Sequence, residues 1–435
     1  MNLVQLTPGA GPMYCGGCLR DNALVAALRR QGHEALMVPL YLPLTLDEAD
    51  EAAGTPIFFG GIKVFLEQKS AIFRGAPGWL RDLLDARPLL KLAAGKAAGT
   101  RPIDVGDLTL SMLRGEEGNQ SRALAELIQW LRTQPRPDVV CLSNALLVGM
   151  ARKLKADLGV PVVCTLQGED FFLDGLPSTH RQECWRTLAS RAAEVDLFIA
   201  PSRYFGDLMR ERLGLRPEQV RVVPNGIHLA GYPTPGTAAP DRRSRPVIGF
   251  FARMCPEKGL DTLVEAFIAL RRRGRAGEVK LRVGGSCGPA DRAFVEEQRG
   301  RLAAAGLEKE VEVLPNPDRA AKIEFLRSLS VVSVPARCGE AFGLYVIEAM
   351  AAGVPVVQPQ VAAFPEVLEV TGGGITCAAN DSQALAEKLE ELLLDPQRAQ
   401  ALGEAGQRAV FEKFSAEEMA RATIAAVADV VPMAR

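Results

Sequence analysis

Glu340-Ala-Phe-Gly-Leu-Tyr-Val-Ile-Glu348 carries two carboxylates eight positions apart, with a glycine directly before a short apolar segment. The apolar segment predicts a helix that begins near Leu344, and Gly353 is a helix breaker. The apolar run Val354-Pro-Val-Val357 then predicts a buried strand. A helix followed closely by a buried strand is typical of α/β proteins, in which strands and helices alternate.

The spacing of the two glutamates suits an elongated anionic ligand. A helix rises about 1.5 Å per residue, so the segment is long enough to lie along a nucleotide diphosphate-sugar. Glu340, in the loop, can accept hydrogen bonds from sugar hydroxyls. The amides of Gly343 and Leu344 open the helix, where the N-terminus favours a diphosphate. Glu348, inside the helix, can bind the ribose hydroxyls.

Residues 335–357 resemble the signature of retaining glycosyltransferases with two Rossmann-like domains, the group called family 4. The family's run Glu-Ala-Met-Ala-x-Gly-x-Pro-Val-Val is matched by Glu348-Ala-Met-Ala-Ala-Gly-Val-Pro-Val-Val357. The resemblance implies an α/β fold of two doubly wound Rossmann-like domains facing across a cleft, the GT-B architecture. It implies a hexosyltransferase that uses a UDP-, GDP- or ADP-sugar and needs neither metal nor other cofactor. An ordinary strand–helix–strand unit with surface carboxylates is the alternative interpretation.

Length and composition agree with a globular protein of two or three domains, since the chain has 435 residues, 48% of them apolar and 24% charged. The formal net charge of −1 gives no reason to expect nucleic acid binding. The nine cysteines are scattered, and the start of the chain reads as a strand and not as a secretory signal. We therefore expect reduced thiols and a cytoplasmic location.

Short apolar runs alternate with amphipathic stretches along the whole chain, which predicts parallel sheets with helices on both faces. Proline and glycine are dense between residues 231 and 246, which is typical of an interdomain linker. We expect an acceptor-binding domain over 1–235 and a nucleotide-sugar-binding domain over 246–411; the resemblance implies that a last helix, about 412–435, packs back on the first domain. The predicted strands lie near 2–7, 35–39, 62–66, 138–142, 160–165, 196–200, 220–223, 246–251, 279–284, 311–314, 330–334 and 354–357.

Two cations follow the first strand of the second domain. Arg253 and Lys258 fall on the family's run Gly-Arg-x-x-x-x-Lys-Gly, with Ala252 in place of the first glycine. A guanidinium fork and an ammonium can together clamp a diphosphate and stabilise its charge as it leaves. Two surface cations near a turn are the plainer alternative. Gly285 ends the next strand and would allow close approach of the donor, and Leu314 lies where the family contacts the base.

The N-terminal domain carries a second glycine loop. Gly16 and Gly17 precede a helix that ends at Gly32, and the resemblance places their amides near the transferred sugar or phosphate. Cys15 and Cys18 flank the two glycines as a Cys-x-x-Cys pair. A redox pair is therefore an alternative function for this loop. The three histidines of the chain do not cluster, so no histidine-based metal site is expected.

The segment that follows the strand near 160–165 departs from the family pattern. The family has Thr-x-His-Gly-x-Asp, and this chain has Gln167 in place of the histidine, followed by Glu169 and Asp170. Glutamine cannot act as a general base, although it can hydrogen-bond a sugar hydroxyl. Gln167 and Asp170 are candidate contacts to the acceptor or the sugar. For Asp170, helix capping is an equal alternative.

Residues 60–101 are basic, with eight Lys or Arg against three Asp or Glu. This segment lies where the family builds its acceptor site, so it could hold an anionic acceptor or make peripheral membrane contact. A solvated helical insertion is the plainer reading. The acceptor is a small molecule, a glycan or a lipid-linked sugar. Two rival functions remain: a polymerising glucosyltransferase similar to glycogen or starch synthase, and a non-catalytic nucleotide-sugar-binding protein.

Overall fold

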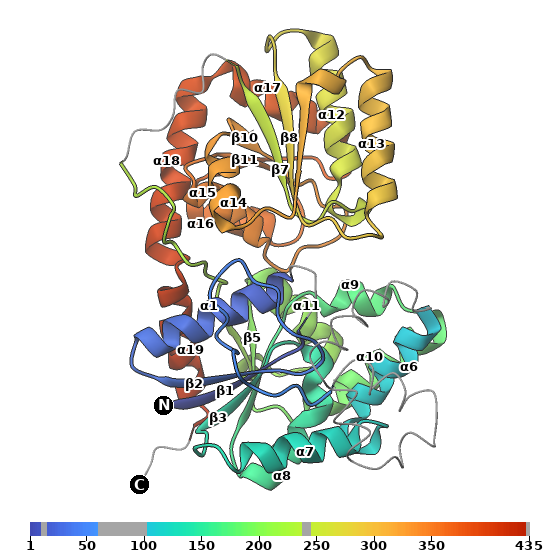
Figure 1. Ribbon diagram of the computed structural model, residues 1–435, viewed down its shortest axis with the longest axis vertical. Helices are drawn as coiled ribbons and strands as arrows, with labels where there is room; N and C mark the ends of the chain where they lie inside the picture. Colours follow the sequence, from blue (N-terminus) through green and yellow to red (C-terminus); the bar gives the residue numbers. More distant parts are fainter. Residues whose placement is uncertain (10–14, 60–101, 237–244, 432–435) are drawn as a thin grey trace. The chain divides into compact units, whose positions relative to one another are not determined.

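The computed structural model describes residues 1–9, 15–59, 102–236 and 245–431. The chain divides into two compact units (Figure 1). Unit 1 consists of Met1–Pro224 with Met419–Arg435, and unit 2 consists of Asn225–Glu418. The predicted strand at 62–66 and most of the predicted linker lie outside the described residues.

Unit 1 is built on a six-stranded parallel sheet in the order β2-β1-β3-β4-β5-β6. The central strands are buried along their whole length, which explains why they read as continuous apolar runs. Every pairing is parallel, so each strand ends at the same edge of the sheet. The strands are β1 (Asn2–Thr7), β2 (Glu34–Pro39), β3 (Val139–Leu142), β4 (Val162–Thr165), β5 (Leu197–Ala200) and β6 (Val220–Val222).

The helices of unit 1 begin and end at residues with clear local reasons. Ser202 caps α11, because its hydroxyl accepts a hydrogen bond from the Phe205 amide at 3.1 Å. Gly159 and Gly214 end α8 and α11 in the left-handed conformation. The helices are α1 (Gly16–Arg30), α6 (Pro102–Arg114), α7 (Ser121–Leu131), α8 (Ala151–Leu158), α9 (Glu169–Asp174), α10 (Ser178–Ala192) and α11 (Arg203–Leu213), and α19 (Ala416–Ala428) runs from unit 2 into unit 1.

Unit 2 contains a second six-stranded parallel sheet, in the order β12-β11-β10-β7-β8-β9. The predicted strands of this unit are confirmed, with ends that differ by a few residues. One strand, β12, was missed because it lies at the sheet edge, starts with glycine and is only partly buried, so its sequence has no long apolar run. The strands are β7 (Val247–Phe251), β8 (Lys280–Gly285), β9 (Val311–Pro315), β10 (Val331–Val332), β11 (Val356–Pro359) and β12 (Gly374–Cys377).

Helices of unit 2 bury apolar side chains against this sheet in one continuous core. Phe267, Phe325 and Phe364 are among the largest fully buried side chains of that core. The helices are α12 (Leu260–Arg273), α13 (Arg292–Ala304), α14 (Arg319–Arg327), α15 (Leu344–Ala351), α16 (Phe364–Thr371), α17 (Ser382–Leu394) and α18 (Pro396–Lys413). In the described ranges no helix is long and apolar enough to cross a membrane.

Candidate active site

Lys258 and Glu340 meet in unit 2 although 82 residues separate them in sequence. Lys258 ends a short 3-10 turn that follows β7, and its ammonium forms an ion pair with the Glu340 carboxylate. Both side chains are partly buried. Gly259 makes this approach feasible, because its φ is +73° and a Cβ there would lie 2.0 Å from the Pro335 carbonyl oxygen. The structure thus brings two predicted site residues into direct contact.

Tyr345 lies beside this ion pair and was not singled out from the sequence. The Lys258 ammonium lies 5.7 Å from the centroid of the Tyr345 ring, within the range of a cation–π contact. Burial, together with the negative charge of Glu340, raises the pKa of the Tyr345 hydroxyl well above its ordinary value. The hydroxyl therefore stays protonated at neutral pH. Its apolar ring helps to seal the pair from water.

The helix predicted near Leu344 is confirmed, since α15 begins at Leu344 and Gly343 is its N-cap. Gly343 has a φ of +85°, and a Cβ there would lie 3.1 Å from the Phe364 ring. The first amides of a helix have no partner within the helix and carry partial positive charge. The N-terminus of α15 can therefore accept an anion next to the ion pair of Lys258 and Glu340.

Glu348 lies within α15, as predicted, and forms an ion pair that the sequence did not indicate. The Lys322 ammonium on α14 lies 2.8 Å from the Glu348 carboxylate, and both side chains are at most 15% exposed. Such a pair holds the carboxylate in one position and balances its charge. No motif links the two residues, so only the tertiary structure could identify Lys322.

Arg253, predicted to clamp a diphosphate, is held by Asp291. The guanidinium donates three hydrogen bonds of 2.9 to 3.2 Å to the Asp291 carboxylate, which also accepts from the Gly288 amide. Asp291 is 6% exposed and Arg253 is 49% exposed. The hydrogen bonds to Asp291 raise the pKa of Arg253. Arg253 is thus oriented and fully charged, and its contact with a diphosphate remains a prediction.

Gly285 and Leu314 lie at the carboxyl ends of neighbouring strands. In the pairing of β8 with β9, Gly284 is opposite Leu314 and Gly285 is opposite Pro315. Ligands of doubly wound sheets bind at this edge. Gly285 has a φ of +123°, and a Cβ there would lie 2.0 Å from the Ala252 carbonyl oxygen. Only glycine fits at this position, which also leaves the edge open to a ligand.

The predicted residues of unit 1 form a separate group. Gly16 and Gly17 open α1, directly after Cys15. The Cys18 thiol, which is buried, donates a hydrogen bond to Cys15, and the Cys18 and Gly17 amides also favour the thiolate. These contacts outweigh burial and lower the pKa of Cys15 to about 7. Thiolates are favoured at helix N-termini.

We expect Cys15 to react with iodoacetamide with a pH midpoint near 7, because its thiolate persists down to that pH. An ordinary cysteine has a pKa of about 8.5. The rate at the Cys15 peptide can be followed by mass spectrometry between pH 5 and 10. Cys18→Ala removes the hydrogen-bond donor and should move the midpoint to higher pH. A midpoint at or above that of an ordinary cysteine in the unaltered protein would contradict the expectation.

Glu169 and Asp170, the two acidic residues after β4, have different surroundings. The Glu169 carboxylate is buried and accepts hydrogen bonds from the Ala145, Gln167 and Gly168 amides at 2.7 to 3.0 Å. Glu169 therefore orders the loop. Asp170 is only partly buried, and within the described residues one of its oxygens is covered without a hydrogen-bond partner. Burial raises the pKa of Asp170.

The described residues contain no cluster of three or more His, Cys, Asp or Glu side chains arranged to hold a metal ion. The predicted site residues of unit 2 gather where its strands end and α15 begins. Those of unit 1 lie at the start of α1 and of α9. Lys322, Asp291 and Tyr345 are the neighbours that the sequence did not identify.

Two family models match most of the described chain. The model for glycosyl transferases group 1 matches residues 239–409. The model for glycosyltransferase family 4 matches residues 108–230. The first match covers the ion pairs and α15, and the second covers the loop with Gln167 and Asp170.

Curated relatives cover part of the chain. A D-inositol 3-phosphate glycosyltransferase of Actinosynnema mirum is 32% identical over 219 residues, which are 48% of this chain and 52% of that protein. The chain thus spans about half the length of such relatives. An alpha-maltose-1-phosphate synthase of Mycolicibacterium smegmatis is 29% identical over 304 residues, or 65% of this chain and 76% of that protein.

Solved structures match over the whole chain and identify the fold. Anabaena Alr3699/HepE in complex with UDP has a TM-score of 0.67 and 18% identity, covering 99% of this chain and 100% of that one. Sucrose-phosphate synthase from Thermosynechococcus elongatus has a TM-score of 0.69 and 17% identity, covering 98% of each chain. With two parallel six-stranded sheets and both family models matched, this chain is a member of the group 1 glycosyltransferases with the GT-B fold.

Proposed function

We propose that this protein is a retaining glycosyltransferase that moves a hexose from a nucleoside diphosphate-sugar to an acceptor hydroxyl without a metal ion. The observation that carries the proposal is the pairing of Lys258 with Glu340 beside the N-terminus of α15. This arrangement places a cation, a carboxylate and free helix amides around one point. A sugar attached to a diphosphate needs these three kinds of group.

The donor is laid along α15 in this proposal. Lys258 and the Leu344 amide hold the diphosphate, and Arg253 extends the positive surface. Glu348 lies four residues after Leu344 on α15, or about 6 Å along the helix axis. Its carboxylate binds the ribose hydroxyls. Glu340 orients the hexose. Lys322 and Asp291 keep Glu348 and Arg253 in position.

Transfer exchanges one bond at the anomeric carbon for another on the same face. The bond from that carbon to the diphosphate oxygen breaks, and a bond to the acceptor oxygen forms. The acceptor proton goes to an oxygen of the leaving diphosphate, so no side chain has to act as base. Gln167, which cannot accept a proton, is compatible with this route. Lys258 stabilises the charge that develops on the leaving group.

A uridine-linked glucose is the first donor to test, because solved structures of Alr3699/HepE contain UDP and UDP-glucose. The names of the curated relatives point to sugar phosphates and inositol phosphate as acceptors or products. Membrane contact through residues 60–101 remains a prediction that lies outside the described residues.

Thermal unfolding with UDP, GDP, ADP and their glucose or mannose conjugates tests the donor site. A ligand at 100 times its dissociation constant adds about 2.7 kcal/mol to the free energy of unfolding. We expect one base to raise the melting temperature of the protein and Glu348→Gln to reduce that rise. If no member of the panel raises it at millimolar concentration, the donor site is wrongly assigned.

Product analysis distinguishes the proposed transfer from the two rival functions. A non-catalytic nucleotide-sugar-binding protein, suggested by Gln167, would show the thermal shift but would release no nucleoside diphosphate with any acceptor. A polymerising enzyme similar to starch synthase would extend an α-glucan primer by many glucose units. A single addition to a small acceptor supports the proposed transfer.

A further inference from the structure

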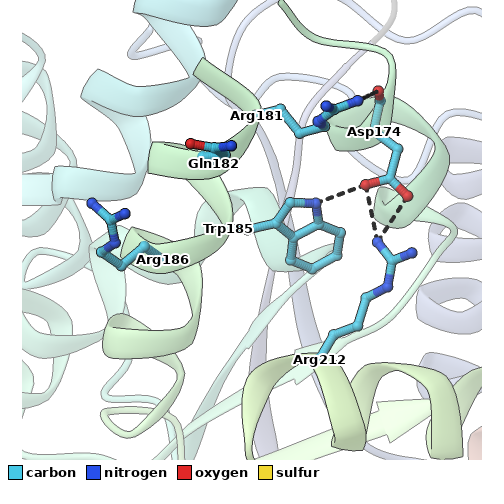
Figure 2. A pocket seen from close by; sticks show the side chains of 6 residues that line it. All are labelled: Asp174, Arg181, Gln182, Trp185, Arg186 and Arg212. Atoms are coloured by element: carbon cyan, nitrogen blue, oxygen red, sulfur yellow. Dashed lines mark hydrogen bonds and ion pairs between the residues drawn. The ribbon is translucent and has the colours of Figure 1, made fainter. Parts of the chain in front are cut away.

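Unit 1 contains a pocket that the proposed donor site does not use. It lies among α9, α10 and α11, as Figure 2 shows, and has a volume of ≈ 470 Å³. None of its lining residues was singled out from the sequence. The pocket is lined by Asp174, Arg181, Gln182, Trp185, Arg186 and Arg212.

Asp174 fixes the aromatic wall of this pocket. Its carboxylate accepts a hydrogen bond of 2.9 Å from the Trp185 indole nitrogen. The same carboxylate accepts two hydrogen bonds from Arg212, at 2.8 and 3.0 Å. The Arg212 guanidinium lies 4.7 Å from the centroid of the Trp185 ring, which is cation–π distance. The indole is thus held in one orientation before any ligand arrives, and the charge of Asp174 is balanced.

Two further arginines leave the pocket with surplus positive charge. Arg181 and Arg186 flank Gln182 and Trp185 on one face of α10, where residues three or four apart are neighbours. Arg181 makes a long contact, 3.4 Å, with the Asp174 carbonyl oxygen. In the part of the chain that the structure describes, no carboxylate forms an ion pair with Arg181 or Arg186. Figure 2 shows Arg186 and Arg212 on opposite sides of Trp185.

We propose that this pocket binds a sugar that carries an oxyanion, such as a phosphorylated monosaccharide, and that this sugar is the acceptor. Arginine forks match the geometry of phosphate oxygens and bind them through paired hydrogen bonds. Trp185 offers an apolar face to the sugar ring, and the Gln182 amide can bond to a hydroxyl. The assignment as acceptor rests on the proposed glycosyltransferase function, whereas the binding of the anion does not.

The pocket is connected to the predicted acceptor loop through α9. Asp170 is the second residue of that helix and Asp174 is its last, so the two lie about 6 Å apart along its axis. The charge of Arg212 acts on Asp170 and lowers its pKa, although burial has the larger, opposite effect. Arg181 contacts the Asp174 carbonyl oxygen, so a sugar whose phosphate binds Arg181 lies beside the helix that carries Asp170. In this proposal the free hydroxyls of the sugar point along α9 toward the loop that contains Gln167.

Side chains on α9 suggest an anionic membrane surface as the alternative ligand of this region. Phe171 and Phe172 on α9 are 47% and 38% exposed, and exposed aromatics beside arginines are also typical of surfaces that bind anionic membranes. We favour the soluble sugar because the cations line a pocket that has a fixed aromatic wall, whereas a membrane surface needs no pocket. The experiment below includes a lipid arm to separate the two.

Calorimetric titration of the protein without any donor tests the pocket directly. Glucose 6-phosphate should bind and glucose should not, because the arginines recognise the anion. The double variant Arg181→Ala with Arg186→Ala should weaken glucose 6-phosphate binding at least about tenfold, because it removes the charge-assisted hydrogen bonds to the phosphate. Arg210→Ala on α11, whose side chain pairs with exposed Asp207, is the matched control and should bind as the unaltered protein does.

Three results would overturn the proposal. They are equal binding of glucose and glucose 6-phosphate, unchanged binding in the double variant, and binding of phosphatidylglycerol vesicles without binding of the sugar phosphate. Circular dichroism checks that the double variant is folded. Its donor-induced thermal shift should be unchanged, so a failure of the pocket leaves the donor site intact. If no nucleotide-sugar raises the melting temperature of the unaltered protein, the proposed glycosyltransferase function is wrong, whereas the proposed anion site is unaffected.

Discussion

Replacing Lys258 with alanine should lower kcat/KM for release of nucleoside diphosphate by about 10²–10³-fold, the usual effect of removing one preorganised charge from a reacting oxyanion. The loss has two physical sources. The leaving diphosphate loses its nearest ammonium, and Glu340 loses the cation with which it pairs. Initial rates measured with the donor identified by thermal unfolding give the value. Lys309→Ala, an exposed lysine in the same unit, is the control and should leave the rate unchanged.

A double-mutant cycle distinguishes a catalytic lysine from a lysine that only neutralises its neighbour. If Lys258 serves only to balance Glu340, then removing both side chains should recover most of the lost rate, because no unpaired buried charge remains. If both residues contact the donor, Lys258→Ala with Glu340→Ala should remain as slow as the slower single variant. Recovery in the double variant would therefore contradict the proposed mechanism.

Gly285→Ala should reduce the free energy of unfolding by about 3 kcal/mol or more, because it combines backbone strain with a clash. The φ of Gly285 is +123°, and an added Cβ would lie 2.0 Å from the Ala252 carbonyl oxygen. That oxygen belongs to the backbone and cannot rotate away. The ends of β7 and β8 would have to separate, which should also weaken donor binding. Urea unfolding followed by circular dichroism measures the loss.

Gly274→Ala provides the matched control for this prediction. Gly274 also has a positive φ, +69°, and also lies in unit 2, but no atom lies within 4 Å of an added Cβ. Its substitution should cost only the strain of a left-handed alanine, about 1 kcal/mol. Equal losses at the two glycines would show that the clash with Ala252 is relieved at little cost.

Much of the fold could be predicted from periodicity. A strand buried on both faces needs an unbroken apolar run, and β3, β4, β5 and β7 have one. β12 could not be found in this way, because an edge strand is covered on fewer sides and tolerates polar and small residues. Strand ends depend on hydrogen-bonded partners, which explains why predicted and observed bounds differ.

The candidate site could be predicted in part. Glu340, Gly343 and Glu348 share one continuous segment, so the sequence placed them together, and the motif as a whole predicts a nucleotide-sugar as their ligand. The partners of these residues come from elsewhere in the chain: Lys322 lies 26 positions before Glu348, and Asp291 lies 38 positions after Arg253. Pairs at such separations leave no periodic trace in a sequence.

The sequence by itself determined the class of fold and the opening of α15 at Gly343. These properties follow from local preferences of the backbone and from the order of side chains along one segment. Only the tertiary structure decided that Lys258 faces Glu340, that Glu169 orders a loop while Asp170 is left partly exposed, and that Asp174 and Arg212 hold Trp185. Each of these contacts depends on packing between segments that are distant in the sequence. Such packing brings charged side chains together without leaving a local pattern in the sequence.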